Sequence, residues 1–93
     1  MQEDYVFEWD DAKSASNAKK HGVSFEQACA IWDDPMFLEV HLMTEPEDRW
    51  AVIGRVGKNS FLTAIITYRA SHVRIVSARQ STKKETGVYY GKN

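Results

Sequence analysis

From residue 37 onward, hydrophobic and polar positions follow a strand-like pattern in successive short segments. Four such segments are rich in β-branched and aromatic residues: 37–43, 49–56, 61–68 and 73–78. Because the links between them are short and parallel crossovers need a dozen or more residues, neighbouring segments are predicted to pair antiparallel. Near the N-terminus, Tyr5, Phe7 and Trp9 alternate in the same way and predict a further strand over 5–9.

Between the first strand and the sheet, the chain carries the start and stop signals of a helix. Asp10 is a suitable N-cap and Gly22 a suitable C-terminal glycine, which predicts a helix over 11–21. Its small residues are expected to form the face that packs closely on a neighbour: Ala12, Ala15 and Ala18.

Two further helices are predicted from capping boxes. Ser24 and Gln27 open a second helix, which Pro35 ends. Its core-facing stripe has the i, i+3, i+4, i+7 spacing of a helix: Phe25, Ala28, Cys29 and Trp32. Thr82 and Glu85 open a short C-terminal helix. The elements predict one α+β domain over residues 1–93, with two N-terminal helices packed on an antiparallel sheet of three to five strands.

The net charge of −1 conceals an asymmetry between the two halves of the chain. Residues 1–48 hold twelve acids and three Lys or Arg, whereas residues 49–93 hold one acid and nine Lys or Arg. A basic surface for an acidic partner such as nucleic acid would give this pattern. Mutual neutralisation of the halves within one small fold would give it as well.

Composition excludes several kinds of site. The single cysteine, Cys29, cannot form an internal disulfide, and no His or Cys spacing suits a zinc site. The five glycines form no phosphate-binding loop. No metal or other cofactor is therefore expected. With an acidic N-terminus and no apolar run long enough for a membrane span, a cytoplasmic protein without membrane contact is expected.

The arginines of the second half are the main candidates for function. Arg49 begins one predicted strand, Arg69 follows another, and Arg79 follows the last. If neighbouring strands are antiparallel, several guanidinium groups converge on one face of the sheet or its rim, where their planar forks suit phosphate. The predicted helix start after Arg79 adds free backbone N–H groups. Solvated edge-strand charges would leave the same pattern. That alternative applies most to four further cations: Arg55, Arg74, Lys83 and Lys84.

The first predicted helix carries a polar stripe: Lys13, Asn17, Lys20 and His21. These residues could contact a nucleic-acid backbone, and His21 could exchange a proton near neutral pH. A helix face exposed to water would look the same. His41 and His72 are lone histidines in or beside strands and are interpreted as structural or incidental.

Several stretches together resemble the BrnT family of type II toxins. They are "FEWDDAKSASNAKKHGVSFEQA" (7–28), "DRW" (48–50), "YR" (68–69) and "RIVSARQSTKKE" (74–85). The resemblance implies a RelE-like fold and a metal-independent endoribonuclease that stops translation by cutting RNA. It also implies a hetero-oligomer with a BrnA-type antitoxin. The toxin would contact operator DNA only indirectly, through this antitoxin.

RNA cleavage without a metal needs alignment of the 2′-hydroxyl, stabilisation of charge on the phosphorus oxygens and proton transfer. Arg49, Arg69 and Arg79 are the candidates for charge stabilisation, and His21 or Tyr89 for proton transfer. Candidate RNA contacts are Lys13, Asn17, Lys20, Arg74, Lys83 and Lys84. Two other functions remain open from sequence alone: a nucleic-acid-binding module without catalysis, and a protein-interaction domain whose basic face docks an acidic partner.

Overall fold

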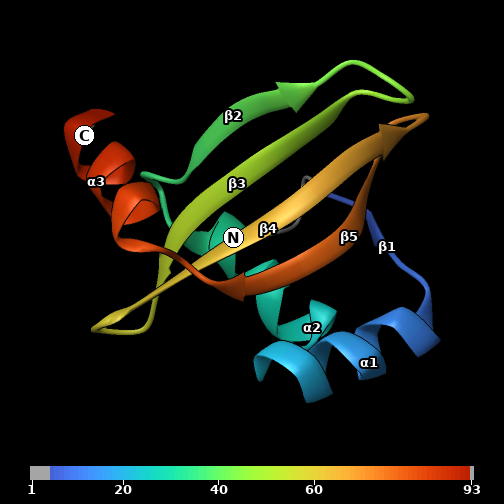
Figure 1. Cartoon of the computed structure of the whole chain (residues 1–93), viewed down its shortest axis with the longest axis horizontal. Helices are drawn as coiled ribbons and strands as arrows, with labels where there is room; N and C mark the ends of the chain where they lie inside the picture. The colour runs from blue at the N-terminus through green and yellow to red at the C-terminus, as the bar shows by residue number, and fades with distance from the viewer. Residues whose placement is uncertain (1–4, 93) are drawn as a thin grey trace.

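The computed structural model describes residues 5–92, and its elements follow the predicted order (Figure 1). In chain order they are β1 (Phe7–Glu8), α1 (Asp11–His21), α2 (Phe25–Ala28), the 3-10 helix η1 (Cys29–Asp33), β2 (Leu38–Met43), β3 (Arg49–Val56), β4 (Ser60–Arg69), β5 (His72–Gln80) and α3 (Lys83–Lys92). The α+β class is confirmed, as are the four strands predicted from residue 37 onward and the helix after Thr82.

The sheet has five strands in the order β1-β5-β4-β3-β2, and it is mixed. Strands β2 to β5 form an antiparallel meander, whereas β1 pairs with β5 in parallel. The prediction of a wholly antiparallel sheet was therefore wrong. It rested on the short links between later strands, and that argument does not apply to β1 and β5, which most of the chain separates. The strand predicted over 5–9 is also shorter, since only Phe7–Glu8 pairs.

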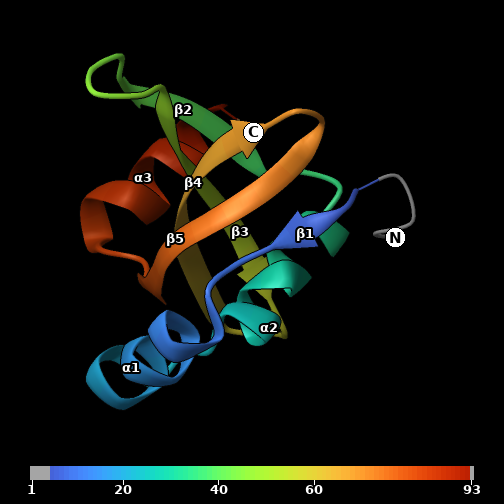
Figure 2. The same cartoon turned by 90° about the vertical axis from the view of Figure 1, so that its right-hand side faces the viewer.

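The two faces of the sheet differ in what covers them (Figure 2). We call one the core face; it contributes buried residues to the main hydrophobic cluster: Val52, Leu62, Ala64, Ile66, Val73, Ile75 and Ala78. Helices α2 and η1 cover it with Phe25, Ile31 and Trp32. We call the other the open face; it carries residues such as Thr63 and Thr67, and α3 covers one end of it.

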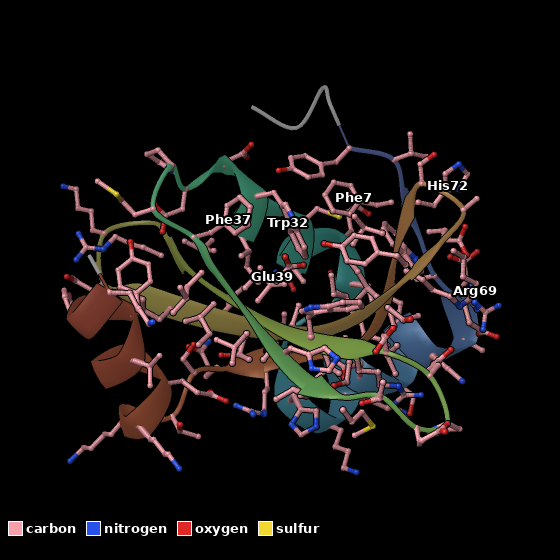
Figure 3. All side chains as sticks on the ribbon, turned by 90° about the horizontal axis from the view of Figure 1, so that it is seen from above. Phe7, Trp32, Phe37, Glu39, Arg69 and His72 are labelled. Atoms are coloured by element: carbon pink, nitrogen blue, oxygen red, sulfur yellow. The ribbon has the colours of Figure 1, made fainter. Side chains whose placement is uncertain are left out.

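An aromatic cluster closes the core between β1, η1 and the segment that leads into β2. Phe7 meets Trp32 edge-on with ring centroids 5.0 Å apart, and Phe37 lies 6.1 Å from Trp32 (Figure 3). Tyr5 contacts all three rings. Strand β1 is therefore held by these rings as well as by its short pairing with β5.

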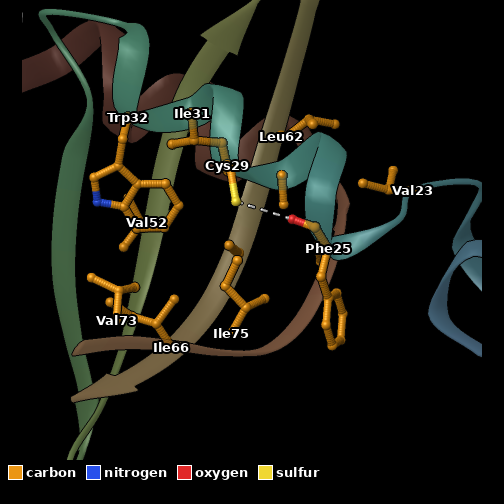
Figure 4. Close-up of a cluster of buried hydrophobic side chains, with 13 residues drawn as sticks. Val23, Phe25, Cys29, Ile31, Trp32, Val52, Leu62, Ile66, Val73 and Ile75 are labelled. Atoms are coloured by element: carbon orange, nitrogen blue, oxygen red, sulfur yellow. Dashed lines mark hydrogen bonds between the residues drawn. The ribbon is translucent and has the colours of Figure 1, made fainter. Parts of the chain in front are cut away.

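The second helix forms as predicted at its start but changes type after one turn. Both hydrogen bonds of the Ser24–Gln27 capping box are present. The α-helix ends at Ala28, and the chain continues as η1 to Asp33. All four residues of the predicted stripe are buried. The Cys29 thiol donates to the Phe25 carbonyl (Figure 4), and burial raises the pKa of this thiol to about 11.

Helix α1 packs through polar residues, so the predicted alanine face was wrong. Ala12 and Ala15 are exposed, whereas Ser14 and Asn17 are buried. The Ser14 hydroxyl accepts a hydrogen bond from the Phe25 backbone N–H at 2.9 Å. Small size allows close packing, but in α1 the packing face is set by hydrogen bonds to the backbone of neighbouring segments.

Asn17 joins α1 to the edge of β5. Its Nδ2 donates to the Ala78 carbonyl at 2.6 Å and to the Val23 carbonyl at 2.7 Å, and its Oδ1 accepts from the Ala78 N–H at 3.3 Å. The side-chain amide thus makes the pair of bonds that a neighbouring strand would make. Strand β1 pairs with β5 only near Val73 and Arg74. Asn17 therefore satisfies the N–H and carbonyl of Ala78, on a part of the β5 edge that β1 leaves unpaired.

We expect Asn17→Ala to lower the free energy of unfolding by roughly 2–4 kcal/mol, because it leaves one N–H and two carbonyls buried without partners. Urea denaturation measures this loss. Lys19→Ala, at an exposed position on the same helix, is the matched control and should change stability little. Equal stability of the two variants would show that the Asn17 bonds contribute nothing.

Two glycine substitutions should act in opposite directions. A Cβ at Gly54 would lie 2.8 Å from Ile31 Cγ2 and 3.0 Å from the Ile31 carbonyl oxygen, so Gly54→Ala should cost about 1–3 kcal/mol through overpacking. Gly87 lies in α3 with nothing near that position, so Gly87→Ala should stabilise by up to about 1 kcal/mol. Thermal unfolding of both variants tests the close approach of β3 to η1. A Gly54→Ala variant as stable as the wild type would contradict that close approach.

Candidate functional site

Three arginines meet on the open face, at the end of the sheet away from α3. Thr67 of β4 pairs with Arg74 of β5, and the register of Trp50 with Ile66 places Arg49 beside Thr67 from the other side. Arg69 follows two residues along β4 on the same face. We call Arg49, Arg69 and Arg74 the arginine cluster. With Lys13 of α1 they line a cavity of about 90 Å³, whose other lining residues are Asp10, Glu47, Thr67, Ile75 and Val76.

A β-bulge in β5 brings Arg74 to this face. The register shifts between Ile65 and Ile66 of β4, so that β5 has one extra residue, Val76, between Ile75 and Ser77. In a regular strand Arg74 and Arg79, five residues apart, would lie on opposite faces. With the bulge, Arg74 pairs with Thr67 and Arg79 with Thr63, and both arginines lie on the open face.

The cations of this site differ in how they are paired. Arg49 donates to Glu47 from Nε and Nη2, at 3.2 and 3.1 Å. Arg74 donates to Glu8 at 2.9 Å. Within residues 5–92, the side chains of Arg69 and Lys13 make no hydrogen bond or ion pair. Arg69 is exposed at the end of β4 (Figure 3), so its guanidinium is ready to bind an anion.

The polar stripe of α1 lines a second hollow beside the first. This hollow, of about 230 Å³, is lined by Lys13, Ser16, Asn17, Lys20, His21, Phe25, Val76 and Ser77. It shares Lys13 and Val76 with the cavity at the arginine cluster. Lys20 and His21 are exposed there, whereas the Asn17 amide is occupied by the backbone of Val23 and Ala78.

Arg79 lies apart from the arginine cluster and anchors α3. Its partner in register, Thr63, is four residues from Thr67, or about 13 Å along the strand. The Arg79 guanidinium donates two parallel hydrogen bonds to Glu85, both 2.7 Å. Glu85 also accepts from Thr63 Oγ1 and from the backbone N–H of Thr82, whose own side chain completes the predicted capping box.

This pairing means that the start of α3 is occupied by a carboxylate of the same helix. Hydrogen bonds, first from Arg79 and then from Thr82 and Thr63, outweigh burial and lower the pKa of Glu85 to about 2. Arg79 and the start of α3 therefore lie together, but Glu85 accepts hydrogen bonds from both. Lys83 and Lys84 are exposed on the first turn of α3.

Tyr89 lies on the buried side of α3, and its hydroxyl donates a hydrogen bond to Asp34 at 2.7 Å. Burial, and then the neighbouring Asp34 carboxylate, raise the pKa of this hydroxyl. His21 and Tyr89, the two groups predicted to transfer protons, therefore lie on different elements, and neither lines the cavity at the arginine cluster.

Four residues of this region were not predicted from the sequence: Glu8, Glu47, Thr67 and His72. Glu8 reaches Arg74 and His72 only because β1 pairs in parallel with β5, which nothing in the local sequence indicates. Thr67 and Glu47 carried a weak signal, since they lie within two residues of Arg69 and Arg49.

Residues 5–92 contain no group of three or more His, Cys, Asp or Glu arranged to hold a metal ion. Among these residues no helix has the length and apolarity to cross a membrane.

The fold and the site together define a small α+β protein with a cluster of arginines on one face of its sheet. The family model described as "Ribonuclease toxin, BrnT, of type II toxin-antitoxin system" matches residues 9–85. The chain therefore belongs to the BrnT family of ribonuclease toxins, and a toxin of a type II system has an antitoxin partner.

The crystal structure of the Brucella abortus ribonuclease toxin BrnT, solved at 1.1 Å, has a similar fold. Its TM-score is 0.63 at 21% sequence identity, and the match covers 85% of this chain and 99% of that chain. Comparison with curated proteins finds no match.

The Glu85 pairing predicts an acid-labile contribution to stability. Because the pKa of Glu85 is lowered in the folded state from 4.5 to about 2, its contribution is complete above pH 4.5 and is lost as the pH falls towards 2. We expect Glu85→Gln to remove about 2 kcal/mol at neutral pH, allowing for solvent screening, and progressively less below pH 4.5.

Urea denaturation of the wild type and Glu85→Gln across this pH range measures the difference. Glu45→Gln, in the exposed loop between β2 and β3, controls for the loss of one acid. A stability difference that stays constant between pH 7 and pH 2 would contradict the assigned role of Glu85.

Proposed function

We propose that this protein is a metal-independent endoribonuclease that binds the scissile phosphate of RNA at the arginine cluster. The observation that carries the proposal is the convergence of Arg49, Arg69 and Arg74 around Thr67, with the Arg69 guanidinium unpaired within residues 5–92. Guanidinium groups keep their charge at any working pH and donate paired hydrogen bonds to phosphate oxygens. They can therefore stabilise the charge that builds up on those oxygens when the 2′-hydroxyl attacks phosphorus.

The second hollow gives the RNA strand a path away from this phosphate. Lys13 lines both hollows, and Lys20 and His21 continue the polar surface along α1. In this proposal Lys13 and Lys20 contact flanking phosphates, and His21 contacts the flanking strand. Asn17 contributes by holding α1 in place.

The α3 end of the open face has a different role in the proposal. Arg79 of β5 is bound to Glu85 and so holds α3 on the sheet, whereas the Tyr89 hydroxyl is bound to Asp34 and joins α3 to the end of η1. We assign them to positioning, and Lys83 and Lys84 to an outer, weaker contact with RNA. This assignment departs from the direct catalytic role that the sequence suggested for Arg79 and Tyr89.

The proposal includes the finer features that the resemblance implied. They are a RelE-like fold, arrest of translation through RNA cleavage, a BrnA-type antitoxin as partner, and contact with operator DNA only through that antitoxin. The family membership of residues 9–85 supports them.

The test is cleavage of RNA by purified, antitoxin-free protein in excess EDTA. We expect the wild type to generate new RNA ends, and Arg69→Ala to cleave about 100- to 1,000-fold more slowly, as when one charge-stabilising donor is lost. Lys58→Ala, at an exposed position in the β3–β4 turn, removes the same charge far from the site and should leave the rate unchanged.

The other outcomes separate the alternatives. Salt-sensitive RNA binding by the wild type without cleavage would favour the nucleic-acid-binding module without catalysis. Equal cleavage by Arg69→Ala and the wild type would place the active site away from the arginine cluster.

A further inference from the structure

A histidine and a carboxylate extend the arginine cluster towards β1. His72 Nδ1 lies 3.0 Å from Glu8 Oε1, and Glu8 Oε2 accepts a hydrogen bond from Arg74 Nη1 at 2.9 Å. One carboxylate therefore bridges an imidazole and a guanidinium of the cluster. Because Glu8 is an acceptor when ionised, the proton between Glu8 and His72 is assigned to Nδ1.

His72 is not among the residues that line the cavity at the arginine cluster, but the register places it next to Arg69, which does line it. His72 and Arg69 are Cα partners across β4 and β5, so their side chains leave the same face as neighbours, both at the right-hand end of Figure 3. The charged groups that face the imidazole are Glu8 from β1, Arg74 from β5 and Arg69 from β4. A phosphate bound by Arg69 and Arg74 would thus lie next to the ring.

The second ring nitrogen of His72 is available. Nε2 makes no hydrogen bond within residues 5–92, and the side chain is 45% exposed. Hydrogen bonds from Arg74 and then His72 lower the pKa of Glu8, so this carboxylate stays ionised and keeps the ring oriented. A base held by a carboxylate with its other nitrogen free is a recurring arrangement for proton abstraction.

We propose that His72 is a catalytic base of this protein, taking the 2′-hydroxyl proton of RNA at Nε2 while Glu8 positions its ring. The inference rests on the proposed ribonuclease function and adds the proton acceptor that the arginines cannot supply.

The step balances without any further reagent. The bond between O2′ and phosphorus forms as the bond between phosphorus and O5′ breaks, and the 2′-hydroxyl proton passes to Nε2. The leaving 5′-oxygen takes a proton from water, and the imidazolium later returns its proton to solvent. The products are a 2′,3′-cyclic phosphate and a 5′-hydroxyl end.

The experiment compares the rate of RNA cleavage against pH for the wild type, His72→Gln and His41→Gln. His41 is the matched control: its side chain is 46% exposed and also contacts a carboxylate, Asp48, at 3.1 Å. We expect His72→Gln to slow cleavage by about 100-fold or more and to lose the rising limb of the pH–rate profile. His41→Gln should match the wild type.

Three further measurements distinguish a base from a structural or binding residue. His72→Gln should bind a 2′-O-methyl RNA, which cannot be attacked by its own 2′-oxygen, as tightly as the wild type does. Added imidazole should partly restore cleavage by His72→Ala, and thermal unfolding should show equal stability of the variants.

Each alternative result is decisive. An unchanged rate and pH profile in His72→Gln would overturn the inference and leave the ribonuclease function standing. A slower variant that keeps the rising limb and is not rescued by imidazole would also overturn it. A wild type that cleaves no RNA would overturn the proposed function, and the inference with it.

Discussion

The hydrogen bonds between Asn17 and Ala78 are the constraint on which the site depends. Strand β5 needs a partner at its outer edge, and β1 provides one only near Val73 and Arg74. Asn17 satisfies the Ala78 N–H and carbonyl further along, so α1 takes the place of a strand there. This docking fixes how far α1 lies from the open face, and so it brings Lys13 to the cavity that the arginine cluster lines.

The distribution of charge on the open face follows from the bulge at Val76. By changing the alternation of β5 once, it keeps Ile75 and Ala78 in the core while both Arg74 and Arg79 reach the same face. The two arginines then differ through their carboxylate partners. Arg79 meets Glu85 of α3 in a two-bond pair, whereas Arg74 shares Glu8 with a histidine. One end of the face is thereby closed by α3, and the other presents cations to solvent.

Local signals in the sequence predicted local structure well. Caps at Asp10, Ser24 and Thr82 mark where helices begin, because each satisfies backbone donors within the same turn. Longer-range features were not predictable in this way. The parallel pairing of β1, the polar docking of α1 and the bulge at Val76 depend on partners far along the chain. Arg49 and Arg69 were predicted to lie together, and both line the same cavity. Arg79 was grouped with them but lies apart, because the sequence indicated Glu85 only as a helix cap and not as the partner of Arg79.

We expect RNA to bind at the arginine cluster and along α1, and not at the α3 end of the open face. Amide chemical-shift mapping by NMR with a short 2′-O-methyl oligoribonucleotide tests it most directly. RNA bound at the arginine cluster should give the largest shifts at Lys13, Arg49, Thr67, Arg69 and Arg74, with small shifts along α3. The largest shifts at Arg79, Lys83 and Lys84, with the cluster unaffected, would contradict it.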